Sequence, residues 1–194
     1  DTRQLQKTQP LPALLKSMPS DIQARALRYR LERDAYNLVA GRILLQKGLK
    51  ELGLDTDISK IRYLPSGKPI LESVHFSISH SEHLVLCALY TEGAIGLDVE
   101  VRQNPDLKNF KDFFTKVEWQ DIMDANDSIG RFYFYWTRKE AVIKALGVNL
   151  DWLHRIGLDT HADIFTIENK EWFFKTLNLG VNVYGALCVS KSTS

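Results

Sequence analysis

Cysteine and proline are both scarce in this sequence. The 194 residues include two cysteines, Cys87 and Cys188, which lie far apart within apolar runs. They therefore predict buried free thiols rather than a disulfide framework. Only six prolines, together with 44% hydrophobic and 25% charged residues, exclude a disordered or a fibrous chain, so we expect a globular protein.

Long apolar runs are missing as well. No stretch approaches the ~18 uninterrupted apolar residues that a membrane-spanning helix needs. The first residues also lack the positive and then apolar pattern of a signal peptide. We therefore expect a soluble cytoplasmic protein with no membrane segment, long enough for one domain or for two small joined lobes.

An excess of one charge sign is absent too, because the formal net charge is +1. Such a balance does not indicate a nucleic-acid-binding protein. Cations nevertheless gather between residues 22 and 50, where two acidic residues accompany seven basic ones: Arg25, Arg28, Arg30, Arg33, Arg42, Lys47 and Lys50. Such a patch could attract phosphates or an acidic protein surface. The alternative is a solvated helix face that binds no ligand.

Apolar spacing predicts helices early in the chain and strands after them. Helical patterning starts at Ser20, which with Gln23 resembles a capping box, and runs to about Leu52, as one helix or as two divided near Asp34. A loop presenting Lys68 follows. We then expect three strands, and we expect the third to pair antiparallel with the second; they cover residues 74–81, 84–90 and 94–101.

The second half of the chain repeats this order of helices and then strands. A helix starts at about Lys116, and a strong helix over Phe132 to Leu146 ends at Gly147. Strands follow near residues 163–168, 171–177 and 181–189. We therefore expect a mixed α+β fold of two lobes, with the boundary after residue 101: residues 1–101 and residues 102–194.

Two carboxylates share one face of the third strand. Asp98 and Glu100 are two residues apart, so their Cα atoms lie ~6.6 Å apart and their side chains point the same way. At an effective dielectric of 20 their charges repel by about 2.5 kcal/mol. A Mg²⁺ ion offsets such repulsion because it prefers carboxylate oxygens. The alternative is an exposed edge strand with a solvated outer face.

The segment "WTRKEAVIKALG" supplies a third carboxylate. Glu140 and Lys144 are four residues apart on one helix face, which by itself is typical of a surface ion pair. Trp136 lies four residues before Glu140 and predicts an apolar anchor there. A carboxylate beside an ammonium is also what phosphoryl transfer requires, for metal binding and for neutralising a leaving group.

The segment "SISHS" places hydroxyls and an imidazole at the end of the first strand. Such a strand end favours phosphate binding by hydrogen bonds, although His80 could also be an ordinary capping or core histidine. The spacing of His75, His80 and His83 matches no common zinc site. No G-x-S-x-G elbow accompanies a Ser/His nucleophile either.

Taken together, "PSGKP", "FSISHS", "IGLDVE" and "WTRKEAVIKALG" resemble the 4′-phosphopantetheinyl transferases of the larger, pseudo-dimeric Sfp type. The resemblance extends from "ARALRYRLERDA" to the final strand. It implies an α+β fold in which each lobe is an antiparallel sheet packed on helices. It also implies a monomer with pseudo-twofold symmetry.

The resemblance also implies roles for particular residues. Mg²⁺ would be bound by Asp98, Glu100 and Glu140. Glu140 would accept a proton from the substrate serine, and Lys144 would neutralise the departing group, so that catalysis rests on Glu140, Lys144 and Asp98. The residues implied to bind coenzyme A are Arg25, Lys68, Ser79, His80, Asp98 and Lys144, with Arg28 as an alternative to Arg25.

The implied activity is transfer of the phosphopantetheine arm of coenzyme A to a serine of an acyl or peptidyl carrier protein. Adenosine 3′,5′-bisphosphate would be released. Two alternatives remain open from the residues alone: a metal-dependent phosphohydrolase that uses water, and a non-catalytic module that binds coenzyme A or a carrier. The carrier could belong to fatty-acid, polyketide, nonribosomal-peptide or lysine pathways.

Overall fold

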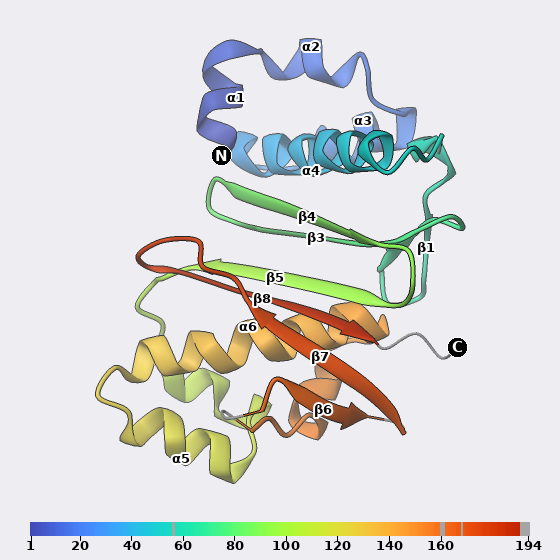
Figure 1. The fold of residues 1–194 in the computed structure, drawn as a ribbon. Coiled ribbons are helices and arrows are strands. Elements are labelled where there is room, and N and C mark those ends of the chain that lie inside the picture. The colour runs from blue at the N-terminus through green and yellow to red at the C-terminus, as the bar shows by residue number, and fades with distance from the viewer. Residues whose placement is uncertain (56, 160–161, 168, 191–194) are drawn as a thin grey trace.

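A computed structural model of the chain shows a mixed α+β fold (Figure 1). It describes residues 1–55, 57–159, 162–167 and 169–190. The helices are α1 (Thr2–Thr8), α2 (Leu11–Leu15), α3 (Ser20–Ala26), α4 (Glu32–Glu51), α5 (Lys116–Asp124) and α6 (Ser128–Leu146), with 3₁₀ segments η1 (Ile58–Lys60), η2 (Leu107–Phe113) and η3 (Leu150–Arg155). The strands are β1 (Arg62–Tyr63), β2 (Pro69–Ile70), β3 (His75–Ser81), β4 (Leu84–Tyr90), β5 (Ile95–Val101), β6 (Ile164–Ile167), β7 (Lys170–Thr176) and β8 (Val183–Ser190).

The described strands form antiparallel sheets. β1 pairs with β2, β3 pairs with β4, and a four-stranded sheet has the order β5-β8-β7-β6. The prediction that the third strand pairs with the second is therefore wrong, because β5 bonds to β8, with Asp98 opposite Ala186. The short turn between β4 and β5 would allow the two strands to form a hairpin. Instead, the backbone of β5 forms its hydrogen bonds with β8, a strand from the far end of the chain.

The pairing of β5 bears on the division of the chain. β5 ends at Val101, yet its sheet is completed by strands from beyond residue 160. The boundary after residue 101 stays a prediction. In the fold, the strand that carries Asp98 and Glu100 lies beside β3 on one side and beside β8 on the other.

Each long helix covers a sheet. α4 packs on β4 and β3, and α6 packs on β5 and β8 (Figure 1). The contact of α6 with β5 is very close: a Cβ at Gly96 would lie 1.8 Å from the backbone oxygen of Ala141. Only glycine permits this approach, which brings β5 against the part of α6 that carries Glu140 and Lys144.

The expected helices are mostly present, with shifted ends. The helical region divides earlier than Asp34, since α3 ends at Ala26 and α4 begins at Glu32. The predicted capping box at Ser20 is wrong, because Pro19 is the N-cap and Gln23 donates to the carbonyl of Met18. No expectation had covered α1 and α2. The predicted strong helix is α6, and Gly147 ends it in the left-handed region at φ 74°.

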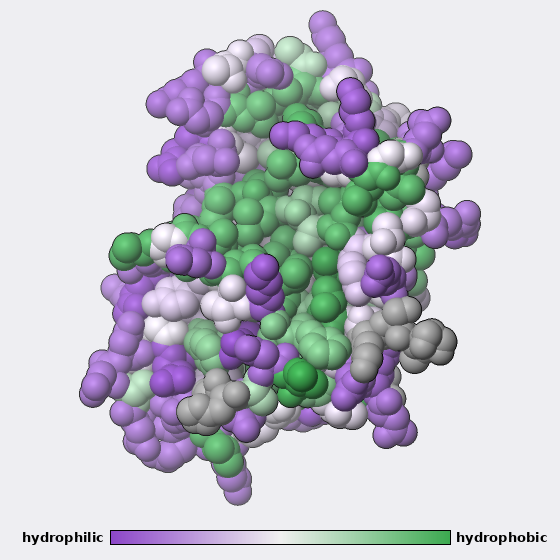
Figure 2. All heavy atoms as spheres, in the orientation of Figure 1, coloured by the Kyte–Doolittle hydropathy of each residue, from purple (hydrophilic) through white to green (hydrophobic). Residues whose placement is uncertain are grey.

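The surface, the two thiols and the helices bear on the predictions made from composition. Apolar side chains gather across the middle of the face that carries β4 and β8, whereas hydrophilic side chains dominate both ends (Figure 2). Cys188 is buried, Cys87 is half-buried and both are free, as predicted. Across the described ranges, no helix has the length and apolar character that a membrane crossing needs.

Candidate active site

β5 places Asp98 in the interior, against α6. Asp98 is only 2% exposed. Oδ1 accepts hydrogen bonds from Lys144 Nζ at 2.6 Å and from Ser79 Oγ at 2.9 Å. Oδ2 is buried with no hydrogen-bond partner among the described residues. Because an unpartnered buried carboxylate oxygen is costly, this atom is suited to a positively charged ligand, and a solvated strand edge is excluded for Asp98.

Glu100 lies two residues further along β5 and is half-buried. Its Oε2 accepts a hydrogen bond from Ser81 Oγ at 2.8 Å. Burial raises the pKa of Glu100 above its ordinary value, and the charge of Asp98 raises it further, while the bond from Ser81 opposes the shift. The repulsion expected between the two carboxylates is thus present in the fold.

α6 brings Glu140 and Lys144 close to the carboxylates of β5. Burial raises the pKa of Glu140 to about 7; Lys144 opposes this, while Asp98 and Glu100 add to it. The ammonium of Lys144 forms its ion pair with Asp98 rather than with Glu140. The two residues of α6 therefore take part in a cluster of three carboxylates and one ammonium, not in an isolated surface pair.

The end of β3 contributes Ser79 and His80. Ser79 is 4% exposed, and its hydroxyl also accepts a hydrogen bond from Lys144 Nζ at 3.1 Å. His80 is exposed at the strand end, so it is not a core histidine. Neighbouring protein still shields its ring in part and lowers its pKa, and the Lys144 ammonium acts in the same direction.

A pocket of about 620 Å³ lies beside this cluster. Glu140 and Lys144 form part of one wall, and Lys68 from the loop between β1 and β2 forms part of another. The full lining is Ser66, Gly67, Lys68, Pro69, Phe76, Ser77, Ile78, Glu140, Ile143, Lys144, Gly147, Val148, Asn149, Leu150 and Asp151. The predicted G-K-P loop and the predicted α6 motif therefore enclose one cavity.

Lys68 is anchored at the edge of that pocket. Its Nζ donates to the carbonyl oxygen of Ala145 at 2.7 Å, near the C-terminal end of α6. Burial lowers the pKa of Lys68 to about 8. A cation at a helix C-terminus is favourable, so Lys68 supports α6 as well as lining the pocket.

Several lining residues were missed from the sequence. Ser66 Oγ is buried without a hydrogen-bond partner among the described residues, and Asn149 and Asp151 follow the end of α6. The proximity of Ser66 to the predicted Lys68 was a usable signal. Nothing in the sequence pattern pointed to Asn149 or Asp151, because the turn after Gly147 brings them back to the pocket.

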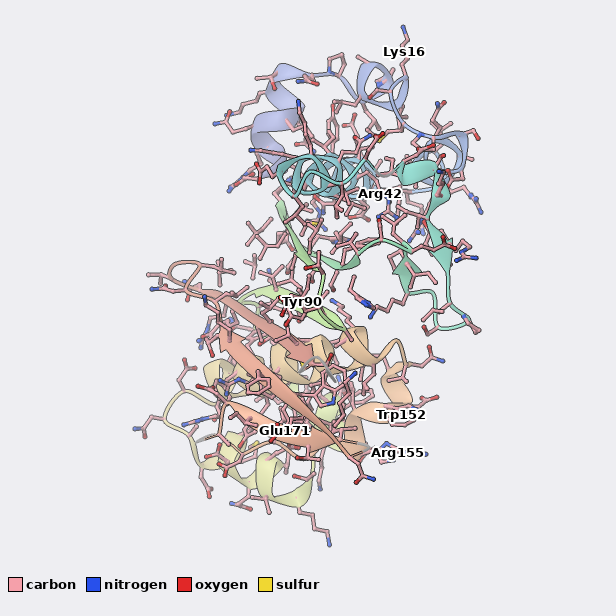
Figure 3. The ribbon with its side chains drawn as sticks, turned by 45° about the vertical axis from the view of Figure 1, so that its right-hand side comes forward. Lys16, Arg42, Tyr90, Trp152, Arg155 and Glu171 are labelled. Carbon is pink, nitrogen blue, oxygen red and sulfur yellow. The ribbon has the colours of Figure 1, made fainter. Side chains whose placement is uncertain are left out.

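The cationic segment lies farther from this cluster. Arg25 is exposed on α3, with its guanidinium carbon 6.0 Å from the ring centre of Tyr63. Arg42, labelled in Figure 3, is 4% exposed and donates to the Tyr63 hydroxyl at 3.0 Å. Arg33 pairs with Glu82. Arg25 thus lies beside the hairpin that leads to the Lys68 loop, but it is not among the residues that line the pocket.

The donor set suits a hard divalent cation. Asp98, Glu100 and Glu140 supply carboxylate oxygens, the type that Mg²⁺ prefers, and Asp98 Oδ2 lacks a partner in the described fold. As they stand, however, the described residues include no group of three or more His, Cys, Asp or Glu side chains arranged to hold a metal ion. The ammonium of Lys144 occupies Asp98 Oδ1 instead.

Several known proteins are similar to this chain in sequence. The model of the 4′-phosphopantetheinyl transferase superfamily matches residues 94–184, which include β5 and α6. A 4′-phosphopantetheinyl transferase gsp from Aneurinibacillus migulanus is 30% identical over 168 residues, which cover 81% of this chain and 70% of that protein. The 4′-phosphopantetheinyl transferase HetI from a Nostoc species is 34% identical over 159 residues, covering 76% of this chain and 67% of that protein.

Two further matches are less similar in sequence. The mouse L-aminoadipate-semialdehyde dehydrogenase-phosphopantetheinyl transferase is 27% identical over 211 residues, covering 91% of this chain and 68% of that protein. The solved holo-[acyl-carrier-protein] synthase of Thermotoga maritima is 17% identical with a TM-score of 0.35, over 51% of this chain and 63% of that chain. On the strength of the sequence relatives, the chain belongs to the 4′-phosphopantetheinyl transferase superfamily.

Proposed function

We propose that this protein transfers the 4′-phosphopantetheine arm of coenzyme A to a serine of an acyl or peptidyl carrier protein, with Mg²⁺, and releases adenosine 3′,5′-bisphosphate. The observation that carries the proposal is the meeting of Asp98, Glu140 and Lys144 beside the pocket that Lys68 also lines. Family membership supports the transfer itself, and the chemistry of the cluster supports the metal and the leaving group.

In the proposed step, the serine oxygen forms a bond to the phosphorus that carries the pantetheine arm. The bond between this phosphorus and the bridging pyrophosphate oxygen breaks, and adenosine 3′,5′-bisphosphate leaves with the bonding electron pair. Asp98, Glu100 and Glu140 would hold Mg²⁺, which supplies charge stabilisation on the pyrophosphate oxygens.

The chain's own residues divide the remaining tasks. Glu140, directly or through a water, accepts the serine proton, as a positioned carboxylate can. Lys144 neutralises the departing bisphosphate. Lys68, His80 and Arg25 hold coenzyme A, so their loss should raise KM more than it lowers kcat.

The test is Glu140→Gln, assayed with coenzyme A, Mg²⁺ and a panel of apo-carrier proteins by the mass increase of the carrier. Loss of transfer is expected, because the amide neither binds Mg²⁺ strongly nor accepts the proton. Glu51→Gln, an exposed carboxylate at the end of α4, serves as the matched control. Near-wild-type transfer by Glu140→Gln would remove its assigned role.

The same assay separates the alternatives. Hydrolysis of coenzyme A without a carrier would identify a phosphohydrolase. Binding of coenzyme A by titration calorimetry with no turnover on any carrier would identify a non-catalytic module. Omission of Mg²⁺ tests the metal dependence directly.

A further inference from the structure

Three serines join β3 to β5. The backbone of β3 pairs with β4, and that of β5 pairs with β8, so neither strand offers the other a regular ladder in the described fold. Serine hydroxyls take the place of carbonyl acceptors instead. The amides of Leu97, Val99 and Val101 donate to the hydroxyls of Ser77, Ser79 and Ser81 at 3.0, 3.2 and 3.0 Å.

Two of these hydroxyls also bind the carboxylates of the site. A hydroxyl has one proton to donate. Ser79 donates to Asp98 at 2.9 Å, and Ser81 donates to Glu100 at 2.8 Å. Ser77 makes the same bond to a β5 amide, but the residue that corresponds to Asp98 and Glu100 on β5 is Gly96, which has no side chain. The three serines therefore share one backbone task, and only two of them orient a carboxylate.

We propose that Ser81 is a positioning residue that orients the Glu100 carboxylate for divalent-cation binding. The proposal rests on the proposed function, since it assumes the metal site there. The Ser81 oxygen is fixed by the Val101 amide, and its proton is committed to Glu100, so the hydroxyl, together with the Trp136 side chain that also hydrogen-bonds to Glu100, helps to set the direction of that carboxylate. Hydrogen bonds of this kind orient metal ligands, and their loss typically costs 10- to 100-fold in metal affinity.

Ser79 orients Asp98 in the same way, but it is a poorer probe. Its oxygen also accepts from Lys144 Nζ at 3.1 Å, so its removal would disturb the ammonium as well. Its single proton is given to Asp98, which leaves none for a phosphate of coenzyme A. Ser81 contacts Glu100 without this complication among the hydrogen bonds of the described residues.

The test is a titration of Mn²⁺, followed by electron paramagnetic resonance, in the presence of coenzyme A. Ser81→Ala should weaken Mn²⁺ binding by about tenfold. Ser81→Thr keeps a hydroxyl and should restore most of the affinity. Ser190→Ala is the matched control, because the Ser190 hydroxyl likewise accepts from a backbone amide, that of Ala94 at 2.9 Å, and Ser190 does not line the pocket. Its Mn²⁺ affinity should stay within about twofold of the wild-type value.

A second measurement needs no metal. In the metal-free protein, thermal unfolding of Ser81→Ala, Glu100→Ala and the double variant should be non-additive, since the two side chains share one hydrogen bond. Additive effects, or equal losses of Mn²⁺ affinity in Ser190→Ala and Ser81→Ala, would overturn the positioning role alone. Wild-type protein that binds no Mn²⁺ would overturn the metal site of the proposed function, and the positioning role with it.

Discussion

Replacement of Gly96 by alanine should separate β5 from α6 and thereby disable the site. The added Cβ would lie 1.8 Å from the oxygen of Ala141 and 2.5 Å from the nitrogen of Ala145. Both atoms belong to the backbone, so no rotamer change relieves the clash. Ordinary van der Waals contact begins at 3.4 Å, so the strand or the helix must move by the difference, about 1.6 Å.

This movement has two measurable consequences. Overpacking typically costs about 1–3 kcal/mol, and a clash with two backbone atoms should place Gly96→Ala at or above the upper end. The 2.6 Å contact of Lys144 with Asp98 lies across the same interface and would be lost. Since a displacement of ~1 Å can cost ~10²-fold in rate, we expect at least this loss of arm transfer.

Urea unfolding followed by circular dichroism gives the stability, and the carrier mass assay gives the rate. Gly157→Ala is the matched control, because its Cβ would meet only the Thr115 methyl at 3.8 Å. A free energy of unfolding for Gly96→Ala within about 1 kcal/mol of that for Gly157→Ala, a small difference on the scale of single substitutions, together with near-wild-type transfer, would refute the close packing of β5 on α6.

Three further predictions concern charged side chains. Lys139 is fully buried and its ammonium bonds to Glu118 at 2.8 Å, so Lys139→Met should cost about 3–5 kcal/mol in urea unfolding, and a loss below 1 kcal/mol would contradict this. Asp98→Asn keeps the shape and removes the charge, so arm transfer should be lost; because the Lys144 side chain is 31% exposed and its ammonium can still be hydrated, the loss of stability should be smaller than for Lys139→Met, and full activity would exclude a charged role. Burial lowers the pKa of Lys68 from 10.5 to about 8, so on raising the pH the folded state loses this proton before the unfolded state does. The contribution of Lys68 to the free energy of unfolding should therefore rise between pH 8 and pH 10.5. The free energy of unfolding of the wild type minus that of Lys68→Met should follow this rise, by at most about 3 kcal/mol, and a flat difference would contradict it.

Much of the local structure was predictable because its causes are local. The apolar spacing of α6 and the glycine that ends it placed Glu140 and Lys144 one turn apart. Alternation and apolar runs located β3 and β4, and the two-residue spacing of Asp98 and Glu100 put both on one face of β5. Burial is the main cause of the raised pKa of Glu100, and the charge of Asp98, two residues away on the same face, adds to it.

Where the prediction was wrong or incomplete, the deciding contacts are distant in sequence. Serine is a residue type that is mostly exposed in proteins, yet Ser77 and Ser79 are buried, because their face of β3 packs on β5. The spacing of Glu140 and Lys144 favoured an ion pair between them on one helix face. Because β5 approaches α6 closely at Gly96, Lys144 forms its ion pair with Asp98 instead.

The sequence by itself determined most of the longer helices and strands and the chemical groups they carry, because periodicity and helix ends depend on neighbours within a few residues. Only the tertiary structure decided that β5 pairs with β8 rather than with β4. It also decided that three serines bridge β3 and β5, that Glu140, Lys144 and the Lys68 loop line one pocket, and that Lys144 connects this pocket to Asp98. The physical reason is that strand edges and buried charges are satisfied by whichever partner the whole fold brings near, and no local pattern specifies that partner.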